Sequence, residues 1–290
     1  MTERTPGMTS GATLVAGVAG NPVRHSLSPL IHSSWIAAAG IDAAYLPFPV
    51  PAGGFTRFAE GLRGGVVRGI NVTIPFKQEA LALADSADAL ARLSGAANLL
   101  LFGEDGRVEA RNTDGPGLLA ALAEQAPGFA VADAPAVILG AGGAARGAAV
   151  ALAVAGAPQL RLVNRTVDRA HELARGFPGA RAYGWESLAE AFAGAGLVVN
   201  ATAVGLGGAG DLNDLPLHLL PADAVVMDMV YKPLRTGLLE AAAASGRPTV
   251  DGLSMLINQA KPSFEAFYGQ PVPAGVDVRG ACLALLGVGP

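Results

Sequence analysis

The sequence predicts an α/β protein of two domains, and three observations lead to this fold class. The chain has 290 residues, 51% of them hydrophobic, so it is long enough and apolar enough to fill two ordinary cores. Short apolar runs bounded by glycine or proline alternate with alanine- and leucine-rich helical patterns, which is typical of βαβ units with parallel strands. A second βαβ series begins afresh at residue 136, and this predicts a second sheet.

The elements of the first domain follow from apolar runs and the turn residues between them. In chain order we expect strand 13–19, helix 29–39, strand 44–49, helix 55–61, strand 67–72, helix 77–91, and a hairpin of strands 98–102 and 108–111. The pair Asp105-Gly106 lies between the last two runs and favours a tight hairpin turn.

The second domain is expected to be a doubly wound dinucleotide-binding fold of the Rossmann type. Its expected elements are strand 136–139, helix 144–155, strand 160–164, helix 167–175, strand 197–202, strand 224–229, helix 234–244 and strand 249–250. Helices at 255–267 and 278–285 end the chain, and Pro262 is expected to kink or interrupt the former. We expect both to return to the first domain. The predicted domains are 12–113 with 253–290, and 114–252, with a cleft between them.

Charge and cysteine content exclude several classes of protein. The net charge is −4, so there is no basic footprint for nucleic acid or for an anionic membrane. Cys282 stands alone and cannot form an internal disulfide. Residues 1–11 lack a signal-peptide pattern, and the apolar runs fall short of the roughly 18 residues that a spanning helix needs. We therefore expect a cytoplasmic protein whose partners are small molecules.

A glycine-rich loop at the start of the second domain predicts a dinucleotide site. The loop matches G-x-G-x-x-[G/A] between a predicted strand and a predicted helix. The first glycine allows a tight turn, the second lets the backbone approach a pyrophosphate, and the final alanine allows close packing of helix on strand. The helix amides then face the phosphates. The expected cofactor residues of this loop are Gly140, Ala141, Gly142, Gly143, Ala144 and Ala145.

The end of the next strand indicates which dinucleotide binds. An NAD enzyme usually has an acidic residue there, against the ribose 2′-hydroxyl. Here the strand ends at Asn164-Arg165-Thr166, and Arg165 and Arg169 flank the turn. A guanidinium suits a 2′-phosphate, which a carboxylate would repel. We predict NADP; the alternative is that both arginines are ordinary solvated residues at a helix start.

Polar residues at the strand ends of the first domain are candidates for substrate binding. Ser26 and Ser28 carry two hydroxyls just before a predicted helix, an arrangement that can hold a carboxylate. Ser28 can equally be only the N-cap of that helix. His25 and His32 have no recognisable partner and are interpreted as structural.

Lys77 and Asp114 are candidates for proton transfer. Lys77 follows a strand and a Pro-Phe pair, and Asp114 lies in the Asn-Thr-Asp-Gly junction between the domains. Each alone is more simply explained as a solvated or capping residue at a helix start. Reduction of a ketone, however, requires a proton for the oxygen as hydride reaches the carbon, and an ammonium paired with a carboxylate can supply it. No His, Cys and carboxylate cluster has ligand spacing, so no metal is expected.

These segments, in their order along the chain, resemble the shikimate dehydrogenase family. Each motif is weak alone, but their joint order is specific, and the resemblance covers nearly the whole chain. The segments that carry it are 20–32, Asn71-Val72-Thr73-Ile74-Pro75-Phe76-Lys77, 95–98, 112–115, 140–146, 164–166, 200–202, 228–231, and 251–256 with Gln259.

The resemblance implies reversible reduction of 3-dehydroshikimate to shikimate by NADPH, a step of aromatic amino-acid biosynthesis. It implies that Lys77 and Asp114 are the catalytic acid–base pair. The implied substrate ligands are Ser26 and Ser28 at the carboxylate, Thr73, Asn98 and Gln259 around the ring hydroxyls, and Tyr231 near the carboxylate. The implied cofactor residues are the loop 140–145 at the pyrophosphate and Arg165, Thr166 and Arg169 at the adenosine 2′-phosphate, with Asn164 beside them.

The sequence departs from the family pattern at Leu99, Leu206, Ser254 and Asn258. Leu99 stands where Thr is common, which puts one polar contact beside the substrate in doubt. Alternatives are an enzyme that prefers quinate or an aminoshikimate or accepts NAD, and a non-catalytic regulator that binds nucleotide or ring acid. The paired serines and the 112–115 junction count against a folate-linked dehydrogenase. The oligomeric state is open between monomer and homodimer.

Overall fold

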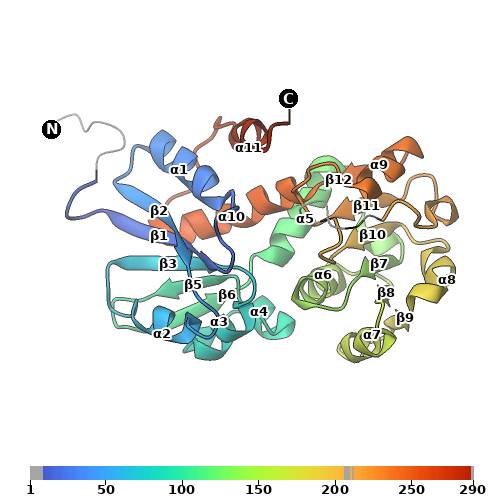
Figure 1. The fold of residues 1–290 in the computed structure, drawn as a ribbon, viewed down its shortest axis with the longest axis horizontal. Helices are drawn as coiled ribbons and strands as arrows, with labels where there is room; N and C mark the ends of the chain where they lie inside the picture. Colours follow the sequence, from blue (N-terminus) through green and yellow to red (C-terminus); the bar gives the residue numbers. More distant parts are fainter. Residues whose placement is uncertain (1–8, 206–209, 211, 289–290) are drawn as a thin grey trace. The chain divides into compact units, whose positions relative to one another are not determined.

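The computed structural model describes residues 9–205, 210 and 212–288 and divides into two compact units. The first unit contains the chain up to Thr113 and again from Gln259 onwards, and the second runs from Asp114 to Asn258. Each unit has one six-stranded sheet with helices on both faces (Figure 1). The predicted α/β class is confirmed.

The sheet of the first unit is mixed. Its strand order is β2-β1-β3-β5-β6-β4, in which β1 is parallel to β2 and β3, while β5 is antiparallel to both β3 and β6. Its strands are β1 Leu14–Gly20, β2 Ala43–Pro49, β3 Val67–Val72, β4 Ser86–Ala87, β5 Leu99–Phe102 and β6 Val108–Arg111. The predicted hairpin is confirmed, because β5 and β6 pair in register across a turn that contains Gly106 at φ +78°.

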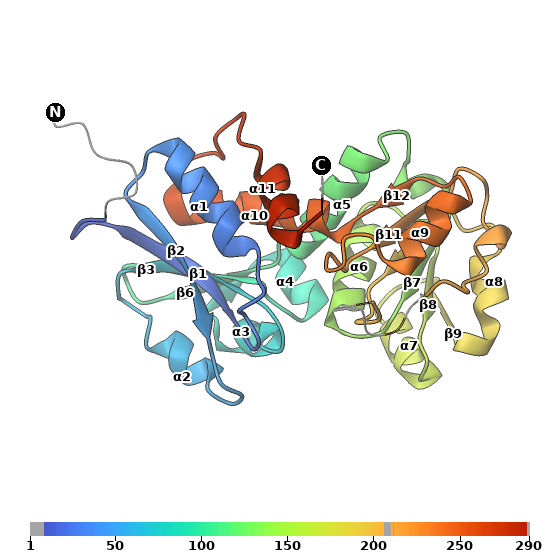
Figure 2. The same cartoon turned by 45° about the horizontal axis from the view of Figure 1, so that its top comes forward.

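Helices cover both faces of this sheet. The helices are α1 Ser28–Ala39, α2 Phe55–Glu60, α3 Lys77–Leu83, α4 Ala89–Ser94, α10 Gly252–Tyr268 and α11 Val278–Leu286. Side chains of α2, α3 and α4, such as Phe55, Ala80 and Ala91, bury one face in an apolar cluster. On the other face α10 approaches β3 so closely that a Cβ at Gly69 would lie 2.6 Å from the Phe267 ring. The two layers of helices are seen in Figure 2.

The sheet of the second unit is entirely parallel. Its strand order, β12-β11-β10-β7-β8-β9, reads 6-5-4-1-2-3 when the strands of this unit are counted alone, which is the Rossmann arrangement. Its strands are β7 Ala136–Leu139, β8 Leu160–Val163, β9 Arg181–Tyr183, β10 Leu197–Asn200, β11 Val225–Asp228 and β12 Thr249–Val250. The direction of the chain across the sheet reverses between β7 and β10, so ligands are expected at the carboxyl ends of the central strands.

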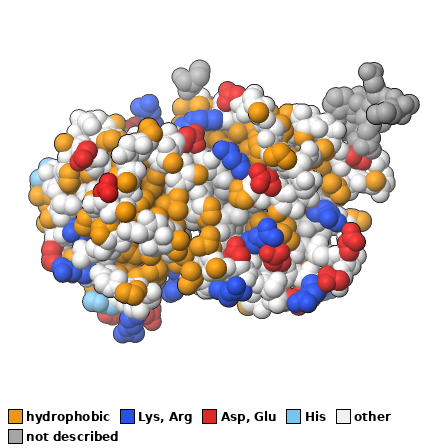
Figure 3. All heavy atoms as spheres, turned by 180° about the vertical axis from the view of Figure 1, so that it is seen from behind, with side chains coloured by type: hydrophobic (Ala, Val, Ile, Leu, Met, Phe, Trp, Pro, Cys, Tyr) orange, Lys and Arg blue, Asp and Glu red, His pale blue; other side chains and the backbone are white. Residues whose placement is uncertain are grey.

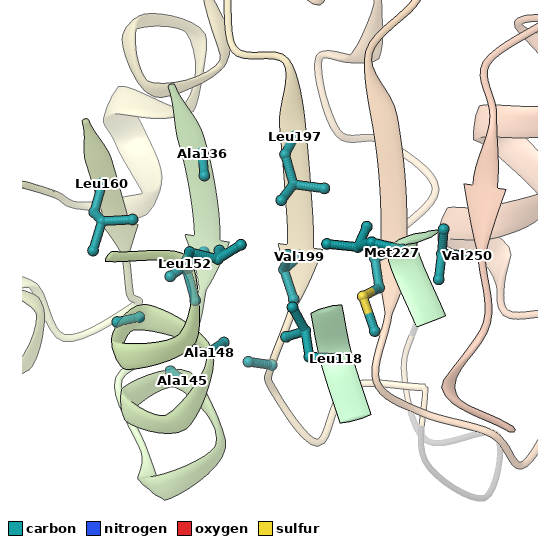
Figure 4. Close-up of a cluster of buried hydrophobic side chains, with 14 of the residues drawn as sticks. Leu118, Ala136, Ala145, Ala148, Leu152, Leu160, Leu197, Val199, Met227 and Val250 are labelled. Carbon is teal, nitrogen blue, oxygen red and sulfur yellow. The ribbon is translucent and has the colours of Figure 1, made fainter. Parts of the chain in front are cut away.

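Two apolar clusters cover the two faces of the second sheet. The helices are α5 Asp114–Gln125, α6 Gly143–Val154, α7 Val167–Ala174, α8 Leu188–Phe192 and α9 Gly237–Ala244, with 3₁₀ helices at Val131–Asp133, Trp185–Ser187 and Leu217–Leu219. Side chains of α5, α6 and α7 bury the face that carries Ala136 and Val199 (Figure 4). Those of α8 and α9 bury the opposite face, which carries Val137 and Val198. Alternate strand residues thus supply opposite cores, as the two-residue period of a strand requires.

The structure corrects three predicted elements. The helix expected at 77–91 is two helices, α3 and α4, separated by strand β4. Strand β9 and helix α8 lie where no element was expected. Pro262 does not interrupt its helix, because α10 continues through it from Gly252 to Tyr268.

No helix among the residues that the structure describes is long and apolar enough to cross a membrane. On the face shown in Figure 3, acidic and basic side chains lie among one another. This distribution agrees with the nearly balanced charge of the sequence.

Candidate active site

Several chain segments of the first unit meet at one edge of its sheet. Because β1 and β3 are parallel neighbours, the segments that follow them leave the sheet at the same edge. Strand β5 runs antiparallel to β3 with Leu99 paired to Asn71, so β5 begins there. Strand β6 pairs its last residue, Arg111, with Leu99, so the chain also leaves β6 there. This edge therefore collects the residues that follow β1 and β3, Asn98, and the segment 112–113.

Ser26 and Ser28 lie where β1 leads into α1. Helix α1 begins at Ser28, its N-cap is Leu27, and no side chain caps it. The interpretation of Ser28 as the N-cap is therefore wrong. The Ser28 amide donates to the Ser26 hydroxyl oxygen at 3.2 Å, which holds the Ser26 side chain against the first residue of the helix. Two hydroxyls at the N-terminal end of a 12-residue helix form a site that favours an anion.

Thr73 and Lys77 follow β3. The Thr73 amide donates to the carbonyl of Ala19 at 2.9 Å, and a Cβ at Gly20 would collide with the Thr73 methyl group. Lys77 is the first residue of α3, and its carbonyl accepts from the amide of Ala97 at 2.8 Å. The backbone of Lys77 thus lies beside the segment that carries Asn98.

Asn98 lies at the centre of a buried polar cluster. Its Nδ2 donates to Thr113 Oγ1 and to Gln259 Oε1, each at 2.9 Å, and its Oδ1 accepts from the Thr113 amide at 2.8 Å. Only 3% of Asn98 and 5% of Thr113 is exposed. Asn98 and Gln259, both expected to bind ring hydroxyls, are therefore in contact although 161 residues separate them.

Asp114 and Tyr231 belong to the second unit. Asp114 is the first residue of α5 and the chain neighbour of the buried Thr113. Tyr231 follows β11, whose last residue, Asp228, is almost wholly buried. Burial raises the pKa of the Asp228 carboxyl, and hydrogen bonds from Thr236, the Val230 amide and Asn200 oppose that rise.

The glycine loop follows β7 and leads directly into α6. Gly140 has φ +108°, and a Cβ there would lie 3.1 Å from the carbonyl oxygen of Ala201, so a glycine is required. Gly142 and Gly143 have open space where a Cβ would be, and both are exposed. Ala145 is fully buried in the apolar cluster below α6. The loop thus exposes backbone without bulky side chains at the N-terminus of the 12-residue helix α6, an arrangement that suits a pyrophosphate.

The candidate 2′-phosphate residues follow the adjacent strand, β8. Asn164 Nδ2 donates to the carbonyl of Thr166 at 2.8 Å and closes the turn into α7. Arg165, Thr166 and Arg169 are exposed around this turn. Because β7 and β8 are parallel neighbours, the turn and the glycine loop lie at the same edge of the sheet.

The structure brings the expected residues together in groups within each unit. The first unit joins Ser26 with Ser28, and Asn98 with Gln259. The second unit joins the glycine loop with the Asn164–Thr166 turn through adjacent strands. Leu206 lies outside the described residues. Among the described residues, no group of three or more His, Cys, Asp or Glu side chains could hold a metal ion.

Sequence reasoning missed three polar residues that border the candidate substrate ligands. They are Tyr45, Asn71 and Ser263, and they are linked by side-chain hydrogen bonds. Asn71 opens the quoted Asn-Val-Thr motif, so its position gave a signal. Tyr45 lies in the apolar stretch of β2 and Ser263 lies outside every recognised motif, so neither gave a signal.

Comparison with known proteins agrees with this arrangement. Residues 18–100 match the shikimate dehydrogenase substrate binding domain family, and residues 121–205 match the shikimate / quinate 5-dehydrogenase family. The NADP(+) shikimate dehydrogenase of Caulobacter vibrioides is 60% identical, over 96% of this chain and 98% of that protein. That of Maricaulis maris is 46% identical over the same shares.

A solved structure extends the comparison to three dimensions. The shikimate 5-dehydrogenase of Thermus thermophilus, in complex with NADP(H) and shikimate, has a TM-score of 0.82 and 37% identity, over 94% of this chain and all of that chain. The match therefore includes both units and the elements that carry the candidate site. The chain belongs to the shikimate dehydrogenase family.

Proposed function

We propose that this protein is an NADP-dependent oxidoreductase that reversibly converts 3-dehydroshikimate to shikimate, with Lys77 and Asp114 as its acid–base pair. Substrate and cofactor are supported by the Caulobacter relative, which is named for shikimate and NADP(+), and by the Thermus enzyme, which is in complex with both. The reaction belongs to aromatic amino-acid biosynthesis, because shikimate is an intermediate of that pathway.

One observation carries the proposal for the catalytic residues. The edge of the first sheet collects the paired serines, Thr73, Lys77 and Asn98, and the chain passes from this edge into Asp114. The segments that carry this cationic residue, the hydroxyl groups and the amide group therefore meet at one edge, and groups of these kinds can bind a polyhydroxylated ring acid. Such convergence of polar groups is typical of a substrate site.

The residues of the second unit fit NADP. The exposed amides of Gly142 and Gly143 would hold the pyrophosphate, and Arg165, Thr166 and Arg169 would hold the 2′-phosphate. Bound NADPH supplies the hydride for the ketone. No carboxylate stands at the Asn164–Thr166 turn before Asp168, so the turn favours NADP over NAD.

The first unit binds and orients the ring acid. Ser26 and Ser28 hold the carboxylate with the helix amides of α1. Thr73, Asn98 and Gln259 hold the ring hydroxyls. Gln259 can act as a donor, because its Oε1 already accepts from Asn98 Nδ2, which leaves Nε2 to face a ligand oxygen.

Lys77 transfers the proton that balances the hydride. As the ketone carbon receives hydride, its oxygen gains negative charge, and the Lys77 ammonium gives a proton to that oxygen. In the reverse direction neutral Lys77 removes the hydroxyl proton. Asp114 stabilises the ammonium form and hydrogen-bonds a ring hydroxyl.

The test is a set of steady-state rates with shikimate and quinate, each with NADP and NAD. We expect the highest kcat/KM for shikimate with NADP. A preference for quinate or for NAD would replace this proposal with the paralogous enzyme, and absence of turnover with all four pairs would favour a binding regulator.

The same assay tests Lys77. We expect Lys77→Ala to lower kcat by about 10²- to 10⁴-fold while the KM for shikimate changes little, because the proton is needed chiefly in the transition state. Lys261→Ala, which removes an exposed lysine of α10, is the matched control and should retain wild-type turnover. Turnover of Lys77→Ala near that of the control would show that Lys77 is not the acid.

A further inference from the structure

Tyr45, Asn71 and Ser263 form a cluster of polar side chains that contacts the proposed ligands Asn98 and Gln259, and Asn71 is its centre. Asn71 Nδ2 donates to the carbonyl of Asn98 at 3.2 Å and to Ser263 Oγ at 2.8 Å. Asn71 Oδ1 accepts from the Tyr45 hydroxyl at 2.8 Å. One carboxamide on β3 therefore connects β2, the start of β5 and helix α10, all within the first unit.

Chemistry fixes the orientation of the Asn71 amide. The Asn98 carbonyl can only accept a hydrogen bond, so the Asn71 group that faces it must be the NH₂ group. Oδ1 therefore faces Tyr45, and the Tyr45 hydroxyl must donate its single proton to it. The donor and the acceptor of each of these bonds therefore follow from the chemistry of the groups, and no hydroxyl orientation has to be assumed.

Ser263 extends the connection to Gln259. Ser263 is fully buried on α10, one helical turn after Gln259, and its hydroxyl lies 3.5 Å from the Gln259 carbonyl. Its oxygen accepts from Asn71, so its own proton is directed toward that carbonyl. The Gln259 side chain in turn accepts from Asn98. Asn98 and Gln259 are thus held at their backbones by Asn71 and Ser263, and to each other by their side chains.

Tyr45 anchors the other side of the Asn71 amide. Its ring stacks on the neutral His32 ring at a centroid distance of 4.0 Å and an interplanar angle of 5°, and Phe267 lies against it. Burial raises the pKa of Tyr45 well above its usual value, although a side-chain hydrogen bond with Ser28 opposes this, so the phenol stays protonated and remains a donor. The same phenol therefore borders one of the two paired serines.

We propose that Asn71 and Ser263 are positioning residues for the reaction, which hold Asn98 and Gln259 in the geometry that receives the ring hydroxyls. The inference rests on the proposed function, because it gives Asn98 and Gln259 the substrate. A half-buried amide whose donor and acceptor groups are both paired is well suited to this task, since any other arrangement leaves a polar group unpaired. Neither residue needs to touch the substrate.

The test uses Ser263→Ala in the full-length enzyme, because this change removes one oxygen and leaves the helix former alanine. We expect the KM for shikimate to rise by about three- to ten-fold, as for a small displacement of a ligand group, while the KM for NADP stays within about two-fold. Ser34→Ala is the matched control: Ser34 on α1 makes the same hydrogen bond to the carbonyl four residues earlier, but has no side-chain partner in this cluster. It should leave both constants unchanged.

A double-mutant cycle with Gln259→Ala separates positioning from general loss of structure. If Ser263 acts through Gln259, Ser263→Ala should change the KM for shikimate by less than about two-fold once Gln259 is already alanine. If Ser263→Ala raised the KM for shikimate by the same factor with Gln259 present and with alanine in its place, the inference would be overturned. A rise in the KM for NADP equal to the rise in the KM for shikimate would also overturn it. If Gln259→Ala raises the KM and Ser263→Ala does not, the inference alone fails. If Gln259→Ala itself has no effect, the assignment of Gln259 as a substrate ligand fails with it.

Asn71→Asp is a second test variant. Aspartate has nearly the same size and shape as asparagine, but the effect expected on the reaction is larger. A carboxylate cannot donate to the Asn98 carbonyl, so this contact becomes repulsive. Ser263 can keep its contact only by donating to the carboxylate, which turns its proton away from the Gln259 carbonyl. In a variant that retains its native circular dichroism, we expect a loss of more than about ten-fold in kcat/KM for shikimate. Wild-type kcat/KM in this variant would contradict the inference.

Discussion

The two units use different means to present groups to a ligand. At the edge of the first sheet, neutral side chains are buried or half-buried and are joined by hydrogen bonds, as Asn71, Asn98 and Gln259 show. At the edge of the second sheet, Gly142 and Gly143 of the loop are exposed, and the arginine side chains beside the loop are exposed as well. The first edge therefore depends on exact side-chain geometry. The second depends on backbone conformation and on charge.

The largest effect expected from this difference comes from the backbone of the second unit. Gly140→Ala forces a non-glycine residue to φ +108° and toward the Ala201 carbonyl. We expect it to lower the free energy of unfolding by about 2 kcal/mol. The KM for NADP should rise more than about ten-fold as the loop shifts, while the KM for shikimate at saturating NADP changes little. Chemical denaturation and initial rates measure the two effects.

The control for Gly140 is Gly179, which also has a positive φ, +76°, but has open space around it. Gly179→Ala should cost about 1–2 kcal/mol of stability and leave the KM for NADP unchanged. If both variants raised the KM for NADP equally, backbone strain rather than loop shape would be the cause.

The next largest effect concerns the stability of the first unit at low pH. His32 is fully buried in an aromatic cluster, and neither ring nitrogen has a hydrogen-bond partner among the described residues. Burial lowers its pKa from 6.5 to about 3. Between these values the unfolded chain binds a proton that the folded protein does not, so stability falls as the pH falls below 6.5. At pH 5 the loss from this group is about 2 kcal/mol.

Replacing His32 by phenylalanine removes the titrating group and keeps an aromatic ring. Urea unfolding at pH 7 and pH 5 should show a difference in stability about 2 kcal/mol smaller in His32→Phe than in the wild type. His171→Phe, at an exposed position of α7, should keep the wild-type difference. An identical pH dependence in His32→Phe and wild type would show that the His32 site admits the charged form.

The smallest effect concerns the exposed arginines of the second unit. Arg165→Ala should raise the KM for NADP about ten-fold, close to 1.4 kcal/mol, and leave the KM for NAD unchanged, because only NADP carries the 2′-phosphate. The effect should shrink at high salt, which screens exposed charges. Arg175→Ala, at the other end of α7, is the control. An equal loss for NAD would mean that Arg165 supports the fold of the turn.

Local sequence patterns were sufficient for most of the fold. Apolar runs predicted every strand longer than three residues. Among the helices, α8 was not predicted, and the segment 77–91, which is rich in alanine and leucine throughout, was wrongly predicted as one helix. It breaks because Ser86 and Ala87 pair with Glu109 and Ala110 of β6, a contact that no local pattern encodes. Asp88 then caps the second helix by accepting from the Ala91 amide.

The residues of the candidate site also divide into those that a local sequence pattern indicates and those that depend on contacts distant in the sequence. Residues that belong to a local motif, such as Lys77 and the glycine loop, could be proposed as site residues from sequence. Tyr45 and Ser263 could not, because their importance arises from contacts with Asn71, which lies 26 and 192 residues away. The interruption predicted at Pro262 is wrong for a related reason: α10 buries Phe264 and Phe267 completely or nearly so, and this burial outweighs the cost of roughly 3 kcal/mol for a proline inside a helix.

The discontinuity of the first unit has a consequence during protein synthesis. The strands of its sheet leave the ribosome before the second unit, but Gln259, Ser263 and the aromatic residues of α10 that complete it follow the second unit. The second unit is one uninterrupted stretch, so its core can close while the nascent chain is still growing. His32 and Trp35 lack their partner Phe264 until the whole second unit has been made. The first unit therefore reaches its native state only after the second unit has been synthesised.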